Sequence, residues 1–156
     1  MSIQPGAVHD EKHPDFRTLI ANIQSEVERL CKKGVKRFMT GACAGVDIWA
    51  GEVILNLMRQ GLALELYSVI PFKDQAIRWT LPQQKRYQAL LSNSSKTILL
   101  SDKYYDGCYR ARNYYLITHA RYLIAVCGEL GGIRSGTQQT INMAMKNGNE
   151  IIYANY

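Results

Sequence analysis

Short apolar runs of strand length alternate with helical patterns along nearly the whole chain. The apolar runs lie at residues 62–70, 98–100, 122–127 and 151–154, and residues 36–40 are predicted to form a further short strand. The helical patterns lie at residues 14–33, 46–61, 82–91, 110–119 and 137–146. Strands that alternate with helices of this length pair in parallel through right-handed crossovers. The sequence therefore predicts an α/β fold, a Rossmann-like doubly wound and mostly parallel sheet of about five strands with helices on both faces.

The length and composition agree with one globular domain. A chain of 156 residues can bury most of the surface that its unfolded form exposes. Its composition, 47% hydrophobic and 21% charged residues, is ordinary for a globular protein. We therefore expect residues 1–156 to form a single domain. No apolar run reaches the roughly 18 residues that span a bilayer, and no charged segment followed by an apolar one opens the chain. We expect a cytoplasmic protein without a membrane partner.

Charge and cysteine usage narrow the class of partner. The formal net charge is +6, which attracts anionic partners such as nucleotides or nucleic acid, although a solvated basic surface explains the same excess. The four cysteines stand singly, without the close pairs of a zinc site or the density of a disulfide framework. We expect reduced thiols and no metal site at Cys31, Cys43, Cys108 and Cys127.

The first glycine-rich turn follows the short strand predicted at 36–40 and precedes a helix. It reads Gly41-Ala42-Cys43-Ala44-Gly45-Val46-Asp47. Small residues let the backbone approach a ligand, and the N–H groups of the helix point outward from such a turn. Asp47 can cap the helix or accept from a ligand hydroxyl. The candidate ligand-binding residues are Gly41, Ala42, Gly45 and Asp47, and tight strand–helix packing is the alternative explanation of the glycines.

A second glycine-rich turn follows the apolar run at 122–127. It reads Gly131-Gly132-Ile133-Arg134-Ser135-Gly136-Thr137. Ser135 or Thr137 can cap the next helix or bind a phosphate, and Arg134 is a forked, permanently charged donor for the same group. The alternative is a capped helix after a flexible loop, in which the arginine has no role. The candidate phosphate-binding residues are Gly131, Gly132, Arg134, Ser135, Gly136 and Thr137.

Between the two turns, residues 104–115 hold five of the ten tyrosines and two arginines. Tyrosine rings stack on bases and arginines bind phosphates, so this segment can hold a nucleotide or a single strand. We expect about half of these rings to pack inward. The three histidines, His9, His13 and His119, are far apart and have no evident nucleophile or metal partner. The sequence therefore offers no catalytic constellation.

A series of short motifs runs in order from about His13 to the C-terminus: Gly45-Val46-Asp47-Ile48-Trp49-Ala50 with Glu52, Pro71-Phe72 with Gln75 and Trp79, Arg86-Tyr87, Gly107-Cys108, Arg112-Asn113, and Gly131-Gly132. In this order they resemble the YpsA-like family of unknown function. That family belongs to the SLOG superfamily, which includes the DNA-processing protein DprA and the LOG phosphoribohydrolases. The resemblance implies a Rossmann-like fold. It also makes Arg112 and Asn113 candidate ligand-binding residues, because a similar pair precedes a strand in DprA.

Two positions depart from the relatives. The LOG enzymes carry a glutamate two residues after their Gly-Thr pair, where this chain has Gln139, and an amide cannot exchange the proton that a catalytic carboxylate supplies. The relatives also open with a strand and a Thr-Gly-His-Arg-type turn that contributes to their ligand pocket. Residues 1–12 here have neither, so the first strand is missing or reduced to a stub. An open sheet edge invites pairing, and we expect a homodimer.

Three functions follow from these features. The leading hypothesis is non-catalytic binding of a phosphate-bearing small molecule, a nucleotide or nucleotide derivative, at the two glycine-rich turns. The first alternative is binding of single-stranded nucleic acid in the manner of DprA, which the basic charge and the tyrosine-arginine segment favour. The second alternative is hydrolysis of a nucleotide N-glycoside of LOG type, against which Gln139 stands. The sequence identifies no cofactor.

Overall fold

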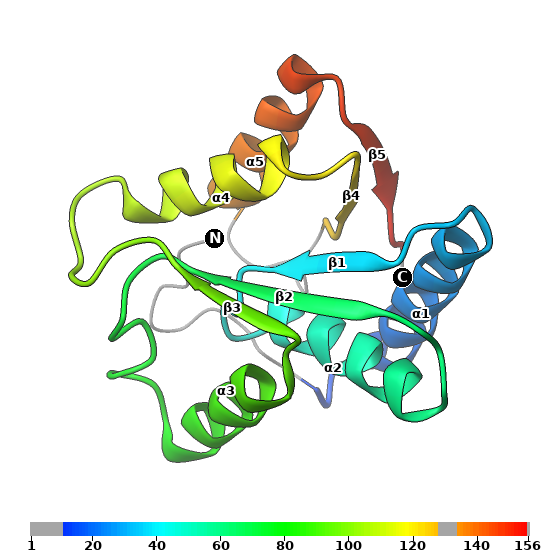
Figure 1. The fold of residues 1–156 in the computed structure, drawn as a ribbon, viewed down its shortest axis with the longest axis horizontal. Coiled ribbons are helices and arrows are strands. Elements are labelled where there is room, and N and C mark those ends of the chain that lie inside the picture. The colour runs from blue at the N-terminus through cyan, green and yellow to red at the C-terminus, as the bar shows by residue number, and fades with distance from the viewer. Residues whose placement is uncertain (1–10, 128–133, 156) are drawn as a thin grey trace.

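Helices and strands alternate along the chain, as Figure 1 shows. The computed structural model describes residues 11–127 and 134–155. The elements, in order, are α1 (Phe16–Lys32), β1 (Arg37–Thr40), α2 (Val46–Arg59), β2 (Glu65–Ile70), α3 (Leu81–Asn93), β3 (Lys96–Leu99), α4 (Cys108–Thr118), β4 (Tyr122–Ala125), α5 (Arg134–Asn147) and β5 (Glu150–Tyr153).

All strand pairs are parallel, but they form two sheets. One sheet has the order β1-β2-β3, and the other contains β4 and β5. The α/β class and the set of about five parallel strands are thus confirmed. Among the described residues the strands do not form one continuous sheet, because β1 and β4 are not paired with each other.

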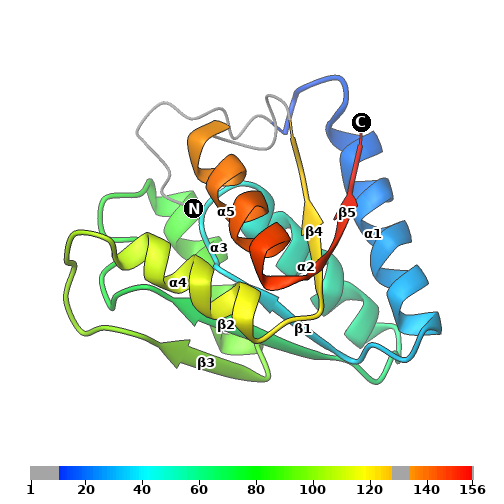
Figure 2. The same ribbon diagram turned by 90° about the horizontal axis from the view of Figure 1, so that it is seen from above.

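Helices cover both sides of the strands. Figures 1 and 2 show α4 and α5 on one side of β1-β2-β3, and α2 and α3 on the other, with α1 beside α2. The core lies between these layers. The side chains of α1 that enter it recur every three or four residues, which is the helical period that the sequence showed. These buried residues are Leu19, Ile23, Val27 and Leu30.

Several helix boundaries follow from local signals. Gly34, with φ of +95°, follows the end of α1 in the left-handed conformation that glycine adopts at little cost. Thr80 and Gln83 form a capping box at the start of α3, where Pro82 suits the first turn. Each of these signals is local and can be found in the sequence.

The start of α5 differs from its predicted position. The helix begins at Arg134, three residues before Thr137. Ser135 and Thr137 therefore lie inside the helix, so capping, one of the two roles considered for them, does not apply, and phosphate binding stays a prediction. A glycine lowers helix propensity by about 1 kcal/mol without ending a helix, so α5 continues through Gly136.

The strand β3 is also more exposed than predicted. The apolar run at 98–100 indicated a buried strand, but β3 lies at the edge of its sheet and Leu99 is 49% exposed. None of the helices in the described part of the chain has the length and apolar character that crossing a membrane requires.

Candidate functional site

The turn between β1 and α2 is closed by its own side chains. The hydroxyl of Thr40 donates to the carbonyl oxygen of Asp47 at 2.8 Å and accepts from the backbone N–H of Ala42 at 3.2 Å. The N–H of Cys43 donates to Oδ2 of Asp47 at 3.3 Å. Asp47 therefore supports the turn, and the N-cap of α2 is Gly45, without a side-chain cap.

The backbone of this turn is strained at one residue. Ala42 has φ of +55°, a left-handed conformation that costs an alanine about 1 kcal/mol, whereas Gly45 reaches φ of +95° at little cost. Such outliers persist only where the surroundings hold them, and they gather at ligand-binding sites. Both residues are buried, so they shape the turn from within.

A buried arginine from α4 holds this turn from the other side. Arg112 is 0% exposed. Its Nη1 donates to the carbonyl oxygen of Gly41 at 2.7 Å, and its Nη2 donates to Sγ of Cys43 at 3.3 Å. Its Nε donates to Oδ1 of Asn113 at 2.8 Å. The guanidinium therefore ties the turn to α4.

The charge of Arg112 is balanced inside the protein. Burial lowers the pKa of its guanidinium, but the nearby Cys43 and Asp47 favour the charged form and raise the pKa above its ordinary value. A Cβ at Gly41 would lie 2.6 Å from Nη1 of Arg112 and 2.9 Å from Oδ2 of Asp47. Only a glycine fits at residue 41 without moving these two groups.

Two residues of the cluster had no predicted role. Gln75, after β2, accepts from Sγ of Cys43 at 3.4 Å and donates to the carbonyl oxygen of Ala42 at 3.5 Å. The ring of Tyr109 lies 5.9 Å from the guanidinium carbon of Arg112, and burial raises the pKa of this phenol to about 12. The sequence could have indicated Gln75, because this residue belongs to the motif that begins at Pro71. For Tyr109, the sequence indicated no role beyond its place in the tyrosine-rich segment.

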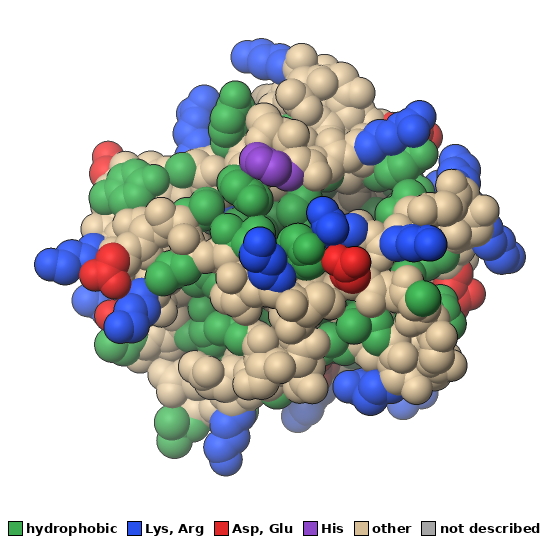
Figure 3. Space-filling view, viewed as in Figure 1, with side chains coloured by type: hydrophobic (Ala, Val, Ile, Leu, Met, Phe, Trp, Pro, Cys, Tyr) green, Lys and Arg blue, Asp and Glu red, His purple; other side chains and the backbone are tan. Residues whose placement is uncertain are grey.

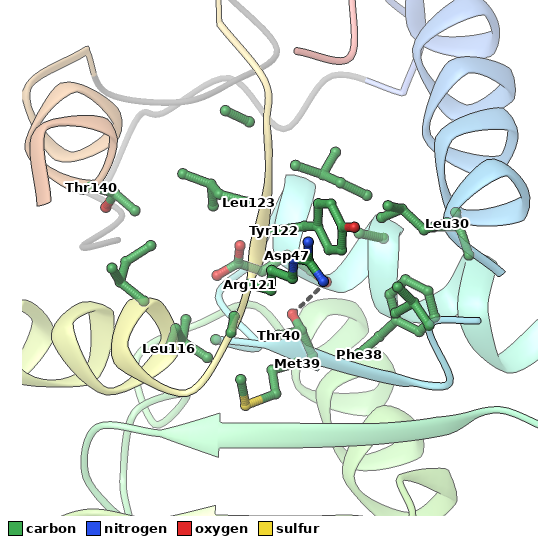
Figure 4. Close-up of a pocket in the computed structure, with 18 of the residues that line it drawn as sticks. Leu30, Phe38, Met39, Thr40, Asp47, Leu116, Arg121, Tyr122, Leu123 and Thr140 are labelled. Carbon is green, nitrogen blue, oxygen red and sulfur yellow. Dashed lines mark hydrogen bonds between the residues drawn. The ribbon is translucent and has the colours of Figure 1, made fainter. Parts of the chain in front are cut away.

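A cavity of about 540 Å³ lies beside the turn, between β1 and β4 (Figure 4). Thr40 and Thr140 contribute hydroxyl groups to its lining. Asp47 is the one carboxylate among the described residues that line it. Four of the predicted ligand-binding residues, from three separate segments, line this cavity: Gly41, Asp47, Asn113 and Thr137.

The other predicted site residues lie elsewhere or are not described. Arg112 is buried behind the turn. Gly131 and Gly132 fall outside the described residues. Arg134 and Ser135 lie in the first turn of α5, where the structure describes the backbone and not their side chains, and Gly136 follows them in the same turn.

The tyrosines of the tyrosine-arginine segment do not line the cavity. Three of its five tyrosines are exposed, and two are partly buried, in agreement with the expected division. The exposed ones are Tyr104, Tyr105 and Tyr114. Arg110 lines a separate groove between α4 and α5, and so does Gln139, the residue at the position of the LOG glutamate.

Neither a metal centre nor a disulfide is found among the residues that the structure describes. No three His, Cys, Asp or Glu side chains come together there in a way that could hold a metal ion. The four cysteines are free thiols, with Cys43 and Cys108 buried and Cys127 exposed.

Three of the motif residues form an ion network on α2 and α3, away from the cavity. Arg86 donates to both carboxylate oxygens of Glu52, at 3.1 and 2.5 Å. Glu11 accepts from Arg86 and from Nε1 of Trp49. The hydrogen bonds to Glu52 outweigh desolvation and raise the pKa of Arg86. The network joins the segment before α1 to α2 and α3, so these motif residues support the fold.

Comparison with known proteins identifies the family of the chain. A family model described as the YspA SLOG family, YpsA, matches residues 6–153. The chain belongs to the YpsA SLOG family. The recognition of this family from the order of the motifs is thereby confirmed.

Relatives of the chain carry the name UPF0398 protein. The chain is 25% identical over 124 residues to the one from Halalkalibacterium halodurans, covering 78% of the chain and 66% of the relative. It is 22% identical over 121 residues to the one from Bacillus pumilus, covering 76% of the chain and 65% of the relative. The matched region thus spans just under two thirds of these relatives' own length.

Proposed function

We propose that this YpsA-family protein binds a nucleotide or nucleotide derivative, without catalysis, at the end of the cavity that adjoins the β1–α2 turn. The observation that carries the proposal is the convergence of Gly41, Asp47, Asn113 and Thr137 on one cavity. These residues come from two helix starts and from α4. Ligands of open α/β sheets bind where strands end and helices begin.

The groups at this end suit different parts of a nucleotide. The Asp47 carboxylate and the Asn113 amide, which both line the cavity, suit ribose hydroxyls. A phosphate would repel Asp47, so it belongs at the N-terminus of α5, where the helix dipole favours an anion. The first residue of that helix is Arg134, and an arginine carries a permanent positive charge.

The test is thermal unfolding in the presence of ATP, NAD and ADP-ribose. A ligand at 100 times its dissociation constant adds about 2.7 kcal/mol, which raises the melting temperature of a domain of this size by roughly 5 to 10 °C. We expect such a shift with at least one of the three. The shift should shrink in Arg134→Ala and in Thr137→Val.

Matched control variants are available on α1. Arg17 and Thr18 are exposed and do not line the cavity, so Arg17→Ala and Thr18→Val should keep the full shift. No shift with any of the three nucleotides in the wild-type protein would contradict the proposal. An equal loss in the α1 variants would show that the effect is not specific to the site.

Binding of single-stranded nucleic acid is the second candidate. It is favoured by the exposure of Tyr104, Tyr105 and Tyr114, since exposed rings can stack on bases. A nucleic-acid strand that displaces several counterions binds much more weakly as the salt concentration rises. The slope of log affinity against log salt concentration is about −0.7 for each phosphate that the protein neutralises. A labelled oligothymidylate titrated at two salt concentrations tests this candidate. Tight, steeply salt-dependent binding without a nucleotide shift would favour it over the nucleotide.

A further inference from the structure

No strand formed by the described residues lies beside the edge of β1 that faces the cavity. Along a strand, the backbone groups of successive residues point to opposite sides. The N–H of Glu65 in β2 donates to the carbonyl oxygen of Lys36, so Lys36 and Phe38 face β2. The backbone groups of Arg37 and Met39 therefore face the cavity.

The edge of β4 on the opposite wall is open in the same way. The N–H groups of Glu150 and Ala154 donate to the carbonyl oxygens of Arg121 and Ala125, so those two carbonyls face β5. The backbone groups of Tyr122 and Ile124 therefore face the cavity. Within residues 11–127 and 134–155, no backbone hydrogen bond joins either edge to another strand across the cavity.

The space between the two edges is covered by apolar side chains on both faces. From one side α1 and α2 contribute residues, and from the other side α4 and α5 contribute them (Figure 4). A strand in the middle of a parallel sheet has such apolar surroundings above and below. The apolar residues that cover the space are Ile23, Val27, Ala50, Ile54, Leu116 and Ile141.

The orientation of the strands fits one missing strand. Adjacent strands rotate by roughly 20 to 25° relative to each other. Figures 1 and 2 show that β4 and β5 are turned strongly away from the direction of β1, and a strand between β1 and β4 would divide this turn into two steps. Residues 121–126 line the space on one wall, so it can hold a strand of about six residues, or 20 Å.

Basic residues surround the end of the space where β1 and β4 begin. Lys33, Arg37 and Arg121 all line the cavity, and Figure 3 shows hydrophobic side chains between basic ones on this face. Arg37 lies 3.4 Å from Glu65. Lys33 and Arg121 lie over the ring of Tyr122 at 6.0 and 5.4 Å, and neither has an ion pair with any residue that the structure describes.

We propose that the space between β1 and β4 binds one β-strand of another polypeptide, in parallel with both neighbours. The strand is apolar on both faces, because both faces of the space are apolar. Its N-terminal end lies at the basic end of the space, so acidic residues precede it. The residues before Asp10 of this chain do not have this character, because they contain no acidic residue and include Pro5-Gly6. This inference goes beyond the proposed ligand site and does not depend on it.

The test uses a fluorescent peptide in which several aspartates precede alternating valine and isoleucine over the length of the space, about six residues. Fluorescence anisotropy with the full chain should show saturable binding of one peptide per chain. The matched control peptide carries N-methyl groups on the valines, which removes backbone donors and leaves the side chains. Its binding should be lost. Equal binding of both peptides would overturn the proposal, since strand pairing would then not contribute.

Charge-reversal variants test the acidic end of the partner. Because Lys33 and Arg121 are at the surface, Lys33→Glu with Arg121→Glu should leave the fold intact and weaken peptide binding about tenfold. The control variant Lys85→Glu, on the exposed side of α3, should bind normally. An unchanged affinity in the double variant would contradict the assigned direction and chemistry of the strand.

A variant that fills the space tests its location. Leu116→Trp adds volume from α4, and its folding can be checked by circular dichroism. It should abolish peptide binding. Two other occupants would overturn the proposal. If the peptide binds only after residues 2–10 are deleted, the chain's own N-terminal segment is the occupant. If peptide binding instead splits a dimer into single chains, a second copy is the occupant.

Discussion

Nη1 of Arg112 donates a 2.7 Å hydrogen bond to the carbonyl oxygen of Gly41, 71 residues earlier in the chain. This bond joins α4 to the turn that follows β1. Through it, one buried cation fixes the shape of a turn from which Gly41, Val46 and Asp47 line the candidate ligand site. The integrity of the site should therefore depend on both residues.

Replacement of Gly41 by alanine should destabilise the protein by about 2 kcal/mol. The added Cβ would lie 2.6 Å from Nη1 of Arg112, and overpacking of this kind costs 1 to 3 kcal/mol. Urea denaturation measures the loss. Gly107→Ala is the comparison, because Gly107 has φ of +91° and open space around its Cβ position, so it should lose only about 1 kcal/mol. A Gly41→Ala loss smaller than the Gly107→Ala loss would contradict the close approach.

Replacement of Arg112 by methionine should cost about 3 kcal/mol or more, since it leaves Asp47 without its buried counter-charge. Arg112→Lys keeps the charge but not the planar fork that reaches Gly41, Cys43 and Asn113, so its loss should be intermediate, about 1 to 2 kcal/mol. Chemical denaturation of both variants gives the order. Equal stability of the two variants would mean that the fork, and not the charge, decides the role of Arg112.

Tyr109 should ionise at a higher pH than an ordinary tyrosine. Burial, then the charges of Cys43 and Cys108, raise the pKa of its phenol from the ordinary value of 10.0 to about 12. A raised pKa favours the protonated folded state, so this contribution to stability is complete below pH 10 and is lost as the pH rises toward 12. Tyr109→Phe should remove the highest-pH part of the phenolate absorbance titration. If the highest-pH part of the titration remains in Tyr109→Phe, burial does not raise the pKa of the Tyr109 phenol.

Nucleoside monophosphates should release no free base on incubation with the protein. Asp47 is the one carboxylate among the described residues of the cavity lining, and it already accepts from the N–H of Cys43. Gln139 lines the groove between α4 and α5 instead. Chromatography measures the free base in the mixture and in a buffer control. Base release above the control that disappears in Asp47→Asn would establish the hydrolase alternative.

The order of elements was readable from the sequence because each element carries a local pattern. The apolar spacing of Leu19, Ile23 and Val27 predicted α1, and the glycine turn after Thr40 separated β1 from α2. The misplaced start of α5 had a physical cause. The Gly-Thr pair looked like a helix start, whereas the helix continues through Gly136 into the preceding turn.

The long-range relationships could not be read in the same way. Arg112 was predicted to bind a ligand, since an arginine beside an asparagine looks the same in a sequence whether it faces solvent or a carbonyl oxygen. Its complete burial depends on residues 69 and 71 positions away, Cys43 and Gly41. The open edges of β1 and β4 also arise from pairing, and pairing between distant strands leaves no periodic signal in either of them.

The central claim, that a phosphate-bearing ligand binds at the turn after β1, is tested most directly by native mass spectrometry of a competition. The 17.7 kDa protein is mixed with ATP, NAD, ADP-ribose and an oligothymidylate in equal amounts. The account predicts a complex of one nucleotide per chain, greatly reduced in Thr137→Val and retained in Thr18→Val. Chains that carry the oligothymidylate and none of the three nucleotides would contradict it.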